Sequence, residues 1–414
     1  MKRILLSAIT ILLLNITVSA QLKFDFYGFL RMDYYFDSRE SVTANENLLF
    51  LYPKDVLLDA NGEDLNEVSN AGFYAFNARP GVKVSGLTIG DAKLSGLIEG
   101  DFAGGSDASG FIRLRRAYAN ANWGNKDLLV GQEWHPFFNM ISPGQLSLST
   151  GAPFQPFNRS PQIKFSLSNN KKTASFDIAA IYQYQFKSMG PDGKSHEYHQ
   201  NTILPELALT GKINLQAFSF GGGVSYLLLQ PETQYEWQGN TYKTTEKIGA
   251  FSCSLFAQYK YGLFVASARS TLGQNTGHLT MLGGYGVSHI DATTGKREYT
   301  SLSQLASWVN LSYGNKYKVN LFWGNSQNLG TKVGKSTSLV ENSALYGSGM
   351  DVQFLNRAAA SFSYNIPHFR VGLEYEFSRA NYGNDNSFNW SNGKYSSTHG
   401  VNNHRITATA SYLF

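Results

Sequence analysis

Apolar residues recur at every second position along most of the chain, and this period restricts the fold more than any other feature. In FDFYGFLRMDYYF (24–36) the even positions are apolar or glycine, while Asp25, Arg31 and Asp33 fall on odd positions. The same alternation appears in residues 174–186 and 370–378. Successive side chains of an extended strand point to opposite faces of a sheet, whereas helical side chains follow a period of 3.6. The chain is therefore predicted to be all-β.

The alternation fits two β architectures, a soluble sandwich and a transmembrane antiparallel β-barrel. In a sandwich the polar face of each strand meets bulk water. Here the segments are about ten residues long, their apolar face carries tyrosine and phenylalanine near the ends, and their polar face mixes charged residues with glycine. Aromatic residues at both ends of short alternating segments are typical of outer-membrane barrels. The sequence therefore favours a transmembrane barrel in the outer membrane of a Gram-negative bacterium, with membrane lipid as its surroundings.

The last ten residues, RITATASYLF (405–414), keep the alternation to the final position. Chain ends are usually polar and poorly ordered. We therefore expect a last strand that is fully paired and closes the barrel against the first strand. Phe414 also resembles the C-terminal signal that outer-membrane barrels present to the barrel assembly machinery.

The first twenty residues predict a secretory signal peptide. Lys2 and Arg3 precede an apolar run over 4–14, and VSA (18–20) forms a small-residue cleavage site. The run is too short to span a bilayer, which argues against a retained anchor. We expect cleavage after Ala20. We expect one barrel domain over 21–414, because the same alternating pattern continues through this range without a linker.

Connector lengths predict the number of strands, since short periplasmic turns alternate with long external loops in such barrels. Short links lie near 88–91, 123–126, 169–172, 215–217, 260–262, 313–316 and 365–368. Long links lie near 37–71, 104–110, 134–159, 188–201, 229–247, 273–300, 326–349 and 380–401. This pattern gives about sixteen strands with both termini in the periplasm. The segment 278–290 also alternates and is interpreted as a hairpin arm within a loop; counting it as a barrel strand leaves eighteen possible.

Charge and cysteine content exclude several classes of protein. The formal net charge of +5 falls to +3 without Lys2 and Arg3, and no block of lysine and arginine is present, so nucleic acid is not expected as a partner. A single cysteine, Cys253, excludes an internal disulfide framework. No metal-ligand or cofactor motif is found, and no metal or cofactor is expected.

A sixteen-stranded barrel encloses an aqueous channel, so function should reside in the side chains that face the lumen. Strand parity assigns these basic residues to the lumen: Arg31, Arg79, Lys83, Lys93, Arg113, Arg115, Lys164, Lys212, Arg269, Lys318, Arg357, Arg370 and Arg405. It assigns these acidic residues: Asp25, Asp33, Glu99, Asp101, Asp177, Glu206, Glu374 and Glu376. An excess of basic side chains favours anions in a pore. The alternative is that the charges pair with each other across neighbouring strands.

The densest charge cluster lies between Glu99 and Arg116. Glu99 and Asp101 alternate on one predicted strand, and Arg113 and Arg115 alternate on the next. Arg116 breaks that rhythm, and the apolar phase shifts after it, which predicts a β-bulge. Without a bulge Arg116 would face lipid, at a cost of about 2–4 kcal/mol near the middle of the membrane. The bulge would turn it toward the channel.

Three segments around this cluster resemble Gram-negative outer-membrane porins of the DcaP-like and phosphate-selective group. They are LIEGDFAGG (97–105), RLRRAYANANWG (113–124) and LLVGQEWHPFF (128–138). In that group an acidic strand precedes an RLR-A-Y strand, and a GQ-x-W corner leads into the third loop. The resemblance is specific over about forty residues.

The resemblance implies a trimeric channel whose third loop, here 134–159, folds inward and narrows the pore. It implies small anions such as dicarboxylates or phosphates as substrates. The phosphate-selective pattern expects lysines in this loop, where the chain has only Arg159. Aromatic residues of the loop would either form an apolar path for solutes or pack the loop against the inner wall: Trp134, Phe137, Phe138, Phe154 and Phe157.

Together these features predict a porin: a passive diffusion channel for small hydrophilic solutes, with a mild, dicarboxylate-like anion preference. Its predicted pore-lining and constriction residues are Arg31, Arg79, Glu99, Asp101, Arg113, Arg115, Arg116, Arg159, Arg357 and Arg370. The alternatives are a general non-selective porin and a barrel scaffold whose external loops act as an adhesin or receptor. An enzyme is not expected, because no histidine has a recognisable nucleophile partner.

Overall fold

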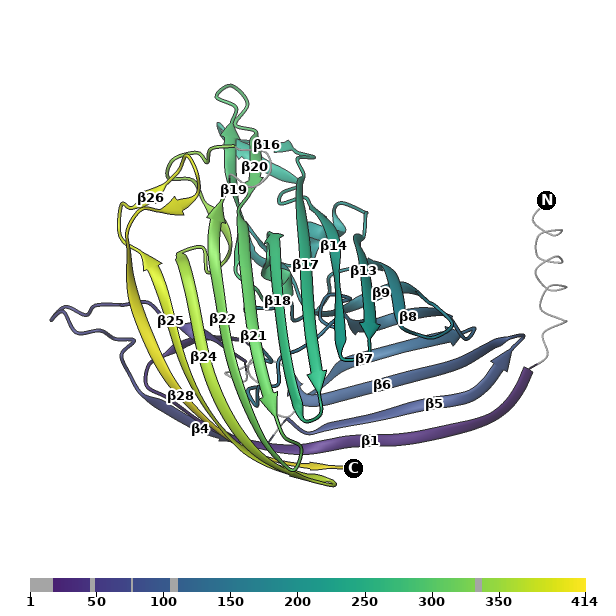
Figure 1. Cartoon of the computed structure of the whole chain (residues 1–414). Coiled ribbons are helices and arrows are strands. Elements are labelled where there is room, and N and C mark those ends of the chain that lie inside the picture. Colours follow the sequence, from purple (N-terminus) through teal and green to yellow (C-terminus); the bar gives the residue numbers. More distant parts are fainter. Residues whose placement is uncertain (1–17, 45–48, 76, 105–110, 332–336) are drawn as a thin grey trace, which may run out of the picture.

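The computed structural model describes residues 18–44, 49–75, 77–104, 111–331 and 337–414, and most of them are extended (Figure 1). Residues 1–17 of the predicted signal peptide lie outside the described residues, and Val18 begins the first strand. Among the described residues, no helix is long and apolar enough to cross a bilayer.

Sixteen antiparallel strands close into one barrel, as predicted, and β9 pairs with β10 to complete the ring. In order around the ring they are β1 (Val18–Asp37), β5 (Arg79–Ile89), β6 (Ala92–Gly104), β7 (Phe111–Asn122), β8 (Lys126–Trp134), β9 (Arg159–Ser168), β10 (Ala174–Ile181), β13 (Glu206–Leu215), β14 (Phe218–Leu229), β17 (Ile248–Tyr261), β18 (Phe264–Gln274), β21 (Ser303–Tyr313), β22 (Tyr317–Gly330), β24 (Val352–Ile366), β25 (Phe369–Gly383) and β28 (Thr398–Leu413).

The barrel closes between β1 and β28, which pair in nine-residue register from Phe29 with Leu413 to Asp37 with Arg405. At its lower end Gly28 exchanges two backbone hydrogen bonds with Phe414, of 2.9 and 3.1 Å. At the upper end Arg405 Nη1 lies 2.7 Å from Asp37 Oδ2, and both side chains are buried inside the barrel. The alternation of the last residues thus belongs to a fully paired strand, as predicted.

The outer face of the barrel is apolar and the inner face is mostly polar. On β25, Leu373 and Tyr375 are about half exposed on the outside, while Glu374 and Glu376 are buried inside. Large aromatic side chains are exposed at the end with short turns: Phe218, Tyr261, Tyr313, Tyr317 and Tyr412. An apolar band bordered by aromatic residues fits a membrane and its interface. The protein is a transmembrane barrel of the outer-membrane type.

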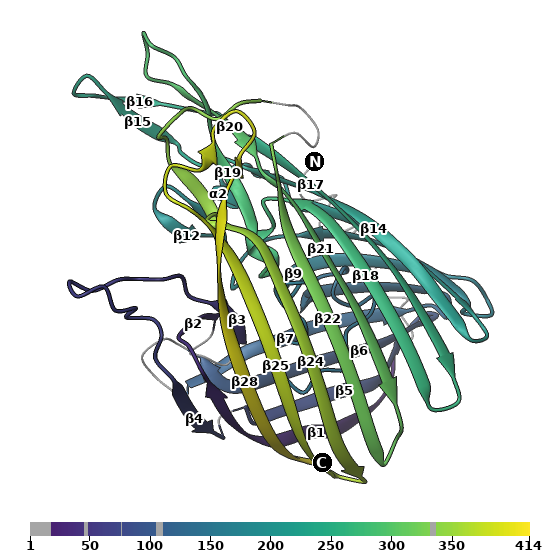
Figure 2. The ribbon, with the colours of Figure 1, turned by 60° about the vertical axis from the view of Figure 1, so that its left-hand side comes forward.

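Short turns and long connections alternate between the two ends of the barrel, as predicted (Figures 1 and 2). The long connections carry small elements of their own: β2 (Ser41–Ala44), β3 (Leu49–Pro53), β4 (Asn70–Tyr74), β11 (Ser188–Gly190), β12 (Gly193–Ser195), α2 (Glu197–Gln200), β15 (Gln234–Trp237), β16 (Asn240–Lys243), η1 (Thr276–Leu279), β19 (Gly283–Ile290), β20 (Arg297–Ser301), β23 (Leu345–Ser348), β26 (Phe388–Asn389) and β27 (Lys394–Tyr395).

The ambiguous segment 278–290 lies outside the barrel wall. Its first residues belong to η1, and β19 pairs with β20 and β23 in a separate three-stranded sheet. The prediction of a hairpin arm within a loop is confirmed, and a count of eighteen strands is wrong. Residues 283–287 are buried on both faces of β19, and Tyr285 is fully buried between Tyr299 and Tyr346.

Candidate functional site

The connection between β8 and β9, residues 135–158, is the third loop and lies inside the barrel. The backbone N–H of His135 donates to the Asn158 carbonyl over 2.9 Å, which closes the base of the loop. Most of the side chains of the loop are buried. A loop that projected from the rim of the barrel would instead be exposed to water. The interior of the barrel is therefore occupied on one side by this loop.

The tip of the third loop is held by charged side chains of the opposite wall. The Leu146 and Ser147 N–H groups donate to the two carboxylate oxygens of Glu374 on β25, over 2.8 and 2.9 Å. Arg31 on β1 donates to the Leu146 carbonyl over 2.6 Å, while it also pairs with Asp33. Both carboxylate oxygens of Glu374 are thus engaged by the loop backbone.

The aromatic residues of the loop pack it against the inner wall. Phe137 and Phe154 are completely buried in a cluster with Phe256, Trp308 and Phe322, which project inward from β17, β21 and β22. Nearer the base of the loop, Trp134 and Phe138 stack on each other, with Phe157 buried beside them. Of the two roles that the sequence left open for these aromatics, packing is the one that Phe137, Phe154 and Phe157 have.

Arg357 on β24 ties two loops to the wall. It is 1% exposed, and it donates to the carbonyls of Ala152 in the third loop and Leu51 on β3, over 3.0 and 2.7 Å. Its Nε lies 3.2 Å from a carboxylate oxygen of Glu376. Parity places Arg357 on the inner face, as predicted, but the loops cover it, and it contacts them instead of open water.

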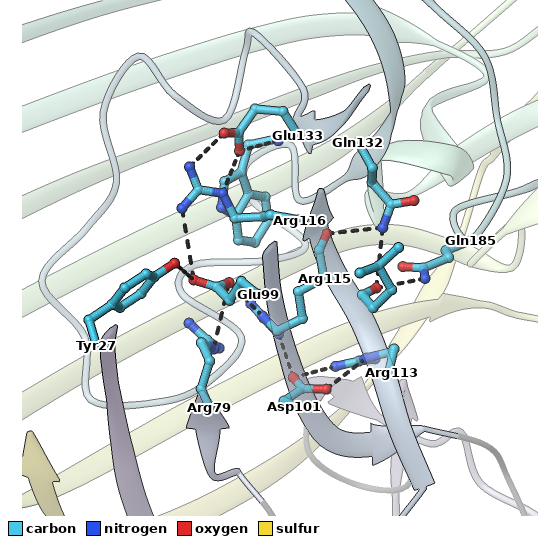
Figure 3. Close-up of polar contacts among 12 residues, drawn as sticks. Tyr27, Arg79, Glu99, Asp101, Arg113, Arg115, Arg116, Gln132, Glu133 and Gln185 are labelled. Carbon is cyan, nitrogen blue, oxygen red and sulfur yellow. Dashed lines mark hydrogen bonds and ion pairs between the residues drawn. The ribbon is translucent and has the colours of Figure 1, made fainter. Parts of the chain in front are cut away.

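The predicted bulge in β7 is confirmed at Arg115. Glu99 of β6 pairs with Arg116, whereas the next residue, Gly100, pairs with Leu114, so Arg115 is the extra residue. The carbonyls exposed by the bulge are satisfied by Gln132, which donates to Leu114 and Arg115, and by Gln185, which donates to Leu114 (Figure 3). The bulge lets Arg113, Arg115 and Arg116 all project into the lumen.

These arginines form ion pairs with three carboxylates (Figure 3). Asp101 pairs with Arg113 and Arg115, over 2.9 and 2.6 Å. Glu99 is 3.2 Å from Arg115, and it lies at longer range, 3.9 and 3.8 Å, from Arg79 and Arg116. Arg116 binds Glu133 of β8 in a bidentate pair of 2.8 and 2.5 Å. Bidentate pairs fix the geometry of a guanidinium firmly.

Arg159, at the start of β9, is the exception. Its guanidinium is 1% exposed and lies over the rings of Trp134, Phe157 and Phe186 at 4.5–5.7 Å. No carboxylate among the described residues lies within ion-pair distance of it, and its Nε and Nη1 have no hydrogen-bond partner. Arg113, Arg115 and Asp101 are close enough to act on Arg159 electrostatically, so Arg159 belongs to the same charged region.

We call Arg79, Arg113, Arg115, Arg116 and Arg159 the arginine cluster. It sets five guanidinium groups against Glu99, Asp101 and Glu133. Arg79, Arg113 and Arg116 keep 17–23% of their side-chain surface exposed, so they present charge to the lumen. Between Pro136 and Asn158 the third loop contains no charged residue. The open side of the lumen is therefore lined by a net positive wall facing a neutral loop.

The other predicted site residues are spread along the lumen. Arg31 anchors the loop tip, and Arg370 is exposed next to the short turn between β24 and β25, away from the arginine cluster. Sequence reasoning missed Glu133, although its place after a Gly-Gln corner next to β7 could have suggested a partner for Arg116. Among the described residues, no group of three or more His, Cys, Asp and Glu side chains is arranged to hold a metal ion.

Several solved structures of outer-membrane proteins have a similar architecture. The outer-membrane channel DcaP of Acinetobacter baumannii superposes with a TM-score of 0.66, at 17% identity over 95% of this chain and 97% of that one. The chain has the fold of an outer-membrane channel. OmpT of Vibrio cholerae (TM-score 0.55, 13% identity, 97% and 100% coverage) and OmpF of Salmonella typhi in complex with daunomycin (0.52, 12%, 95% and 98%) share it. No protein-family model matches the sequence, and no curated protein is similar to it at a significant level.

Proposed function

We propose that the protein is a porin, a passive diffusion channel for small hydrophilic solutes across the outer membrane, which performs no covalent chemistry. Three features support this: the closed sixteen-stranded barrel, the polar lumen, and the third loop that narrows the lumen from inside. The folds of DcaP and OmpF support the same class of function. The constriction would lie between the third loop and the arginine cluster.

The proposed channel prefers anions of dicarboxylate type. The observation that carries this preference is the arginine cluster, in which five guanidinium groups face three carboxylates and Arg159 has no ion pair. A ring of arginine in a narrow passage raises the local concentration of anions. The exposed edges of Arg79, Arg113 and Arg116 would contact the solute, with Arg115 and Arg159 contributing charge from behind.

The test is the reversal potential of the refolded protein in a planar bilayer under a KCl gradient, followed by block with succinate or phosphate. We expect an anion-sided potential. Arg159→Gln should lower the anion-to-cation permeability ratio roughly twofold, since one unit charge at about 8 Å in water is worth about 0.5 kcal/mol. Arg159 is the favoured position because its removal leaves no carboxylate without a partner. Lys171→Gln, on a periplasmic turn, is the matched control and should change nothing.

The runner-up function is a general non-selective porin, and the ion pairs of Asp101, Glu99 and Glu133 favour it because they neutralise most of the cluster. A reversal potential near zero in wild type would establish it and overturn the anion preference. Absence of any conductance would contradict the porin proposal and direct attention to the external loops as an adhesin or receptor surface. The exposed apolar residues of the first loop, Leu57, Leu58 and Leu65, would be the first to examine there.

We further propose that residues 1–20 are removed as a signal peptide, and that the mature chain is inserted by the barrel assembly machinery and forms a homotrimer. Native mass spectrometry of protein extracted from outer membranes tests processing and assembly together. The expected result is a species of three chains, each lacking residues 1–20. A monomer, or a chain that retains these residues, would contradict the corresponding half of the proposal.

A further inference from the structure

Three side chains from distant parts of the sequence meet at the base of the third loop. Glu206, the first residue of β13, is 1% exposed. Its Oε1 lies 3.2 Å from His135 Nε2 and its Oε2 lies 3.2 Å from His278 Nε2. His135 begins the third loop, and His278 belongs to η1 in the connection between β18 and β21. We call these three residues the histidine latch, because Glu206 joins both segments to the wall.

The two segments that the latch joins also bind each other directly. Phe157 N–H donates to the Leu279 carbonyl, and Asn158 Nδ2 donates to the His278 carbonyl, each over 2.7 Å. Thr280 Oγ1 donates to the Phe157 carbonyl over 2.7 Å. Movement of η1 would therefore move the base of the third loop with it.

Hydrogen-bond partners assign the protonation of His135. The Phe137 N–H donates to its Nδ1 over 3.2 Å, so Nδ1 must carry a lone pair. The proton of the neutral ring is then on Nε2, where it donates to Glu206. His135 is therefore a neutral imidazole when the latch is closed.

His278 has a different set of partners. Its Nδ1 lies 3.3 Å from the Asn275 carbonyl and its Nε2 faces the Glu206 carboxylate. Both partners only accept hydrogen bonds, so His278 satisfies both only when both nitrogens carry protons. The latch thus holds one imidazolium, which neutralises the buried charge of Glu206. A buried carboxylate without such a partner is strongly disfavoured.

The remaining ionisable neighbours do not supply that charge. His199 on α2 accepts the Gln183 N–H at Nδ1. Burial lowers the pKa of His199 and outweighs the opposing effect of Glu206, so the neutral form is favoured. Glu133 is occupied by Arg116, and Arg159 lies among aromatic rings. Only His135 and His278 donate hydrogen bonds to Glu206 among the described residues.

We propose that the histidine latch makes the position of the third loop depend on pH. The conductance is then steady near neutral pH and fluctuates at both acid and alkaline pH. At acid pH His135 Nδ1 would gain a proton and could no longer accept the hydrogen bond from the Phe137 N–H. At alkaline pH His278 loses its proton and leaves Glu206 without a counter-ion. The released state binds one more proton than the closed latch on the acid side and one fewer on the alkaline side. The population of the released state therefore rises about tenfold for each pH unit below the acid transition or above the alkaline transition.

The test is single-channel recording of wild type, Glu206→Gln and His278→Gln between about pH 4.5 and 9, a range that brackets histidine titration. Wild type should show closures that become frequent at both ends. Glu206→Gln should fluctuate at all pH values. His278→Gln keeps a donor to Glu206 but removes its counter-ion, so it should fluctuate near neutral pH, where wild type is steady. Glu232→Gln is the control, because Glu232 pairs with Arg297 away from the third loop.

The electrical readout rests on the proposed channel function, so a second readout is independent of it. At one pH near neutral, chymotrypsin should cleave after Phe137 or Phe138 about tenfold faster in folded Glu206→Gln than in wild type, as expected if the loss of one charged hydrogen bond releases the loop. Faster cleavage without conductance in any variant would refute the channel and leave the latch standing. Identical pH profiles and cleavage rates in wild type and both latch variants would overturn the latch.

Discussion

Replacing Arg357 with alanine is expected to lower the free energy of unfolding by about 3–5 kcal/mol, because it removes one partner of a buried ion pair. Glu376, 2% exposed, would lose the ion-pair partner that lies 3.2 Å from its carboxylate. The carbonyls of Ala152 and Leu51 would lose their donors at the same time. The contacts of the guanidinium with the rings of Phe50 and Phe154 would be lost as well.

The measurement is urea unfolding of the protein in lipid vesicles, followed by tryptophan fluorescence. Arg370→Ala is the matched control: it removes the same group from an exposed position on the neighbouring strand and should change stability by less than about 0.5 kcal/mol. Equal stability of Arg357→Ala and wild type would mean that the two loops do not depend on this side chain.

Replacing Glu374 with alanine should release the tip of the third loop while the barrel stays folded. Two buried backbone N–H groups, of Leu146 and Ser147, would lose a charged acceptor. Hydrogen bonds to charged groups contribute about 1.5–3 kcal/mol each, so the released population should rise by a factor of about 100 or more. Arg31 would remain as the only charged anchor described at the tip.

Single-channel recording would show this release as a broad distribution of conductance levels in Glu374→Ala, where wild type has one narrow level. Asp25→Ala removes another carboxylate from the inner wall, and since Asp25 pairs with Lys23 far from the loop it should keep the narrow level. A narrow distribution in both variants would show that aromatic packing alone fixes the loop tip.

The wall of the barrel could be predicted from the sequence because it is determined by patterns among residues that are close together in the chain. Alternation places each side chain inside or outside, short links fix where strands turn, and the phase shift after Arg116 indicates the bulge. The inner and outer faces of β25 and β28 follow directly from this period. The same rule put Glu99, Asp101, Arg113 and Arg115 on the inner face of two neighbouring strands, where they form ion pairs.

The filling of the lumen could not be predicted in this way. Glu374 meets Leu146 across 228 residues of sequence, and His278 meets Glu206 across 72, so no local pattern links them. Parity identifies Arg357 as inward-facing but cannot show that two loops cover it. The sequence also could not show that Arg159 stacks on aromatic rings with no carboxylate partner.

The seam between β1 and β28 has a consequence for how the barrel forms. Asp37 and Arg405 are separated by 368 residues, so their contact requires the ends of nearly the whole chain to meet, and such contacts form late. A one-residue slip of the seam would turn Arg405 from the inner face of β28 to its outer face and separate it from Asp37. The buried charge pair thus acts as a check on the final step of assembly, because the correct register brings Arg405 beside Asp37 inside the barrel.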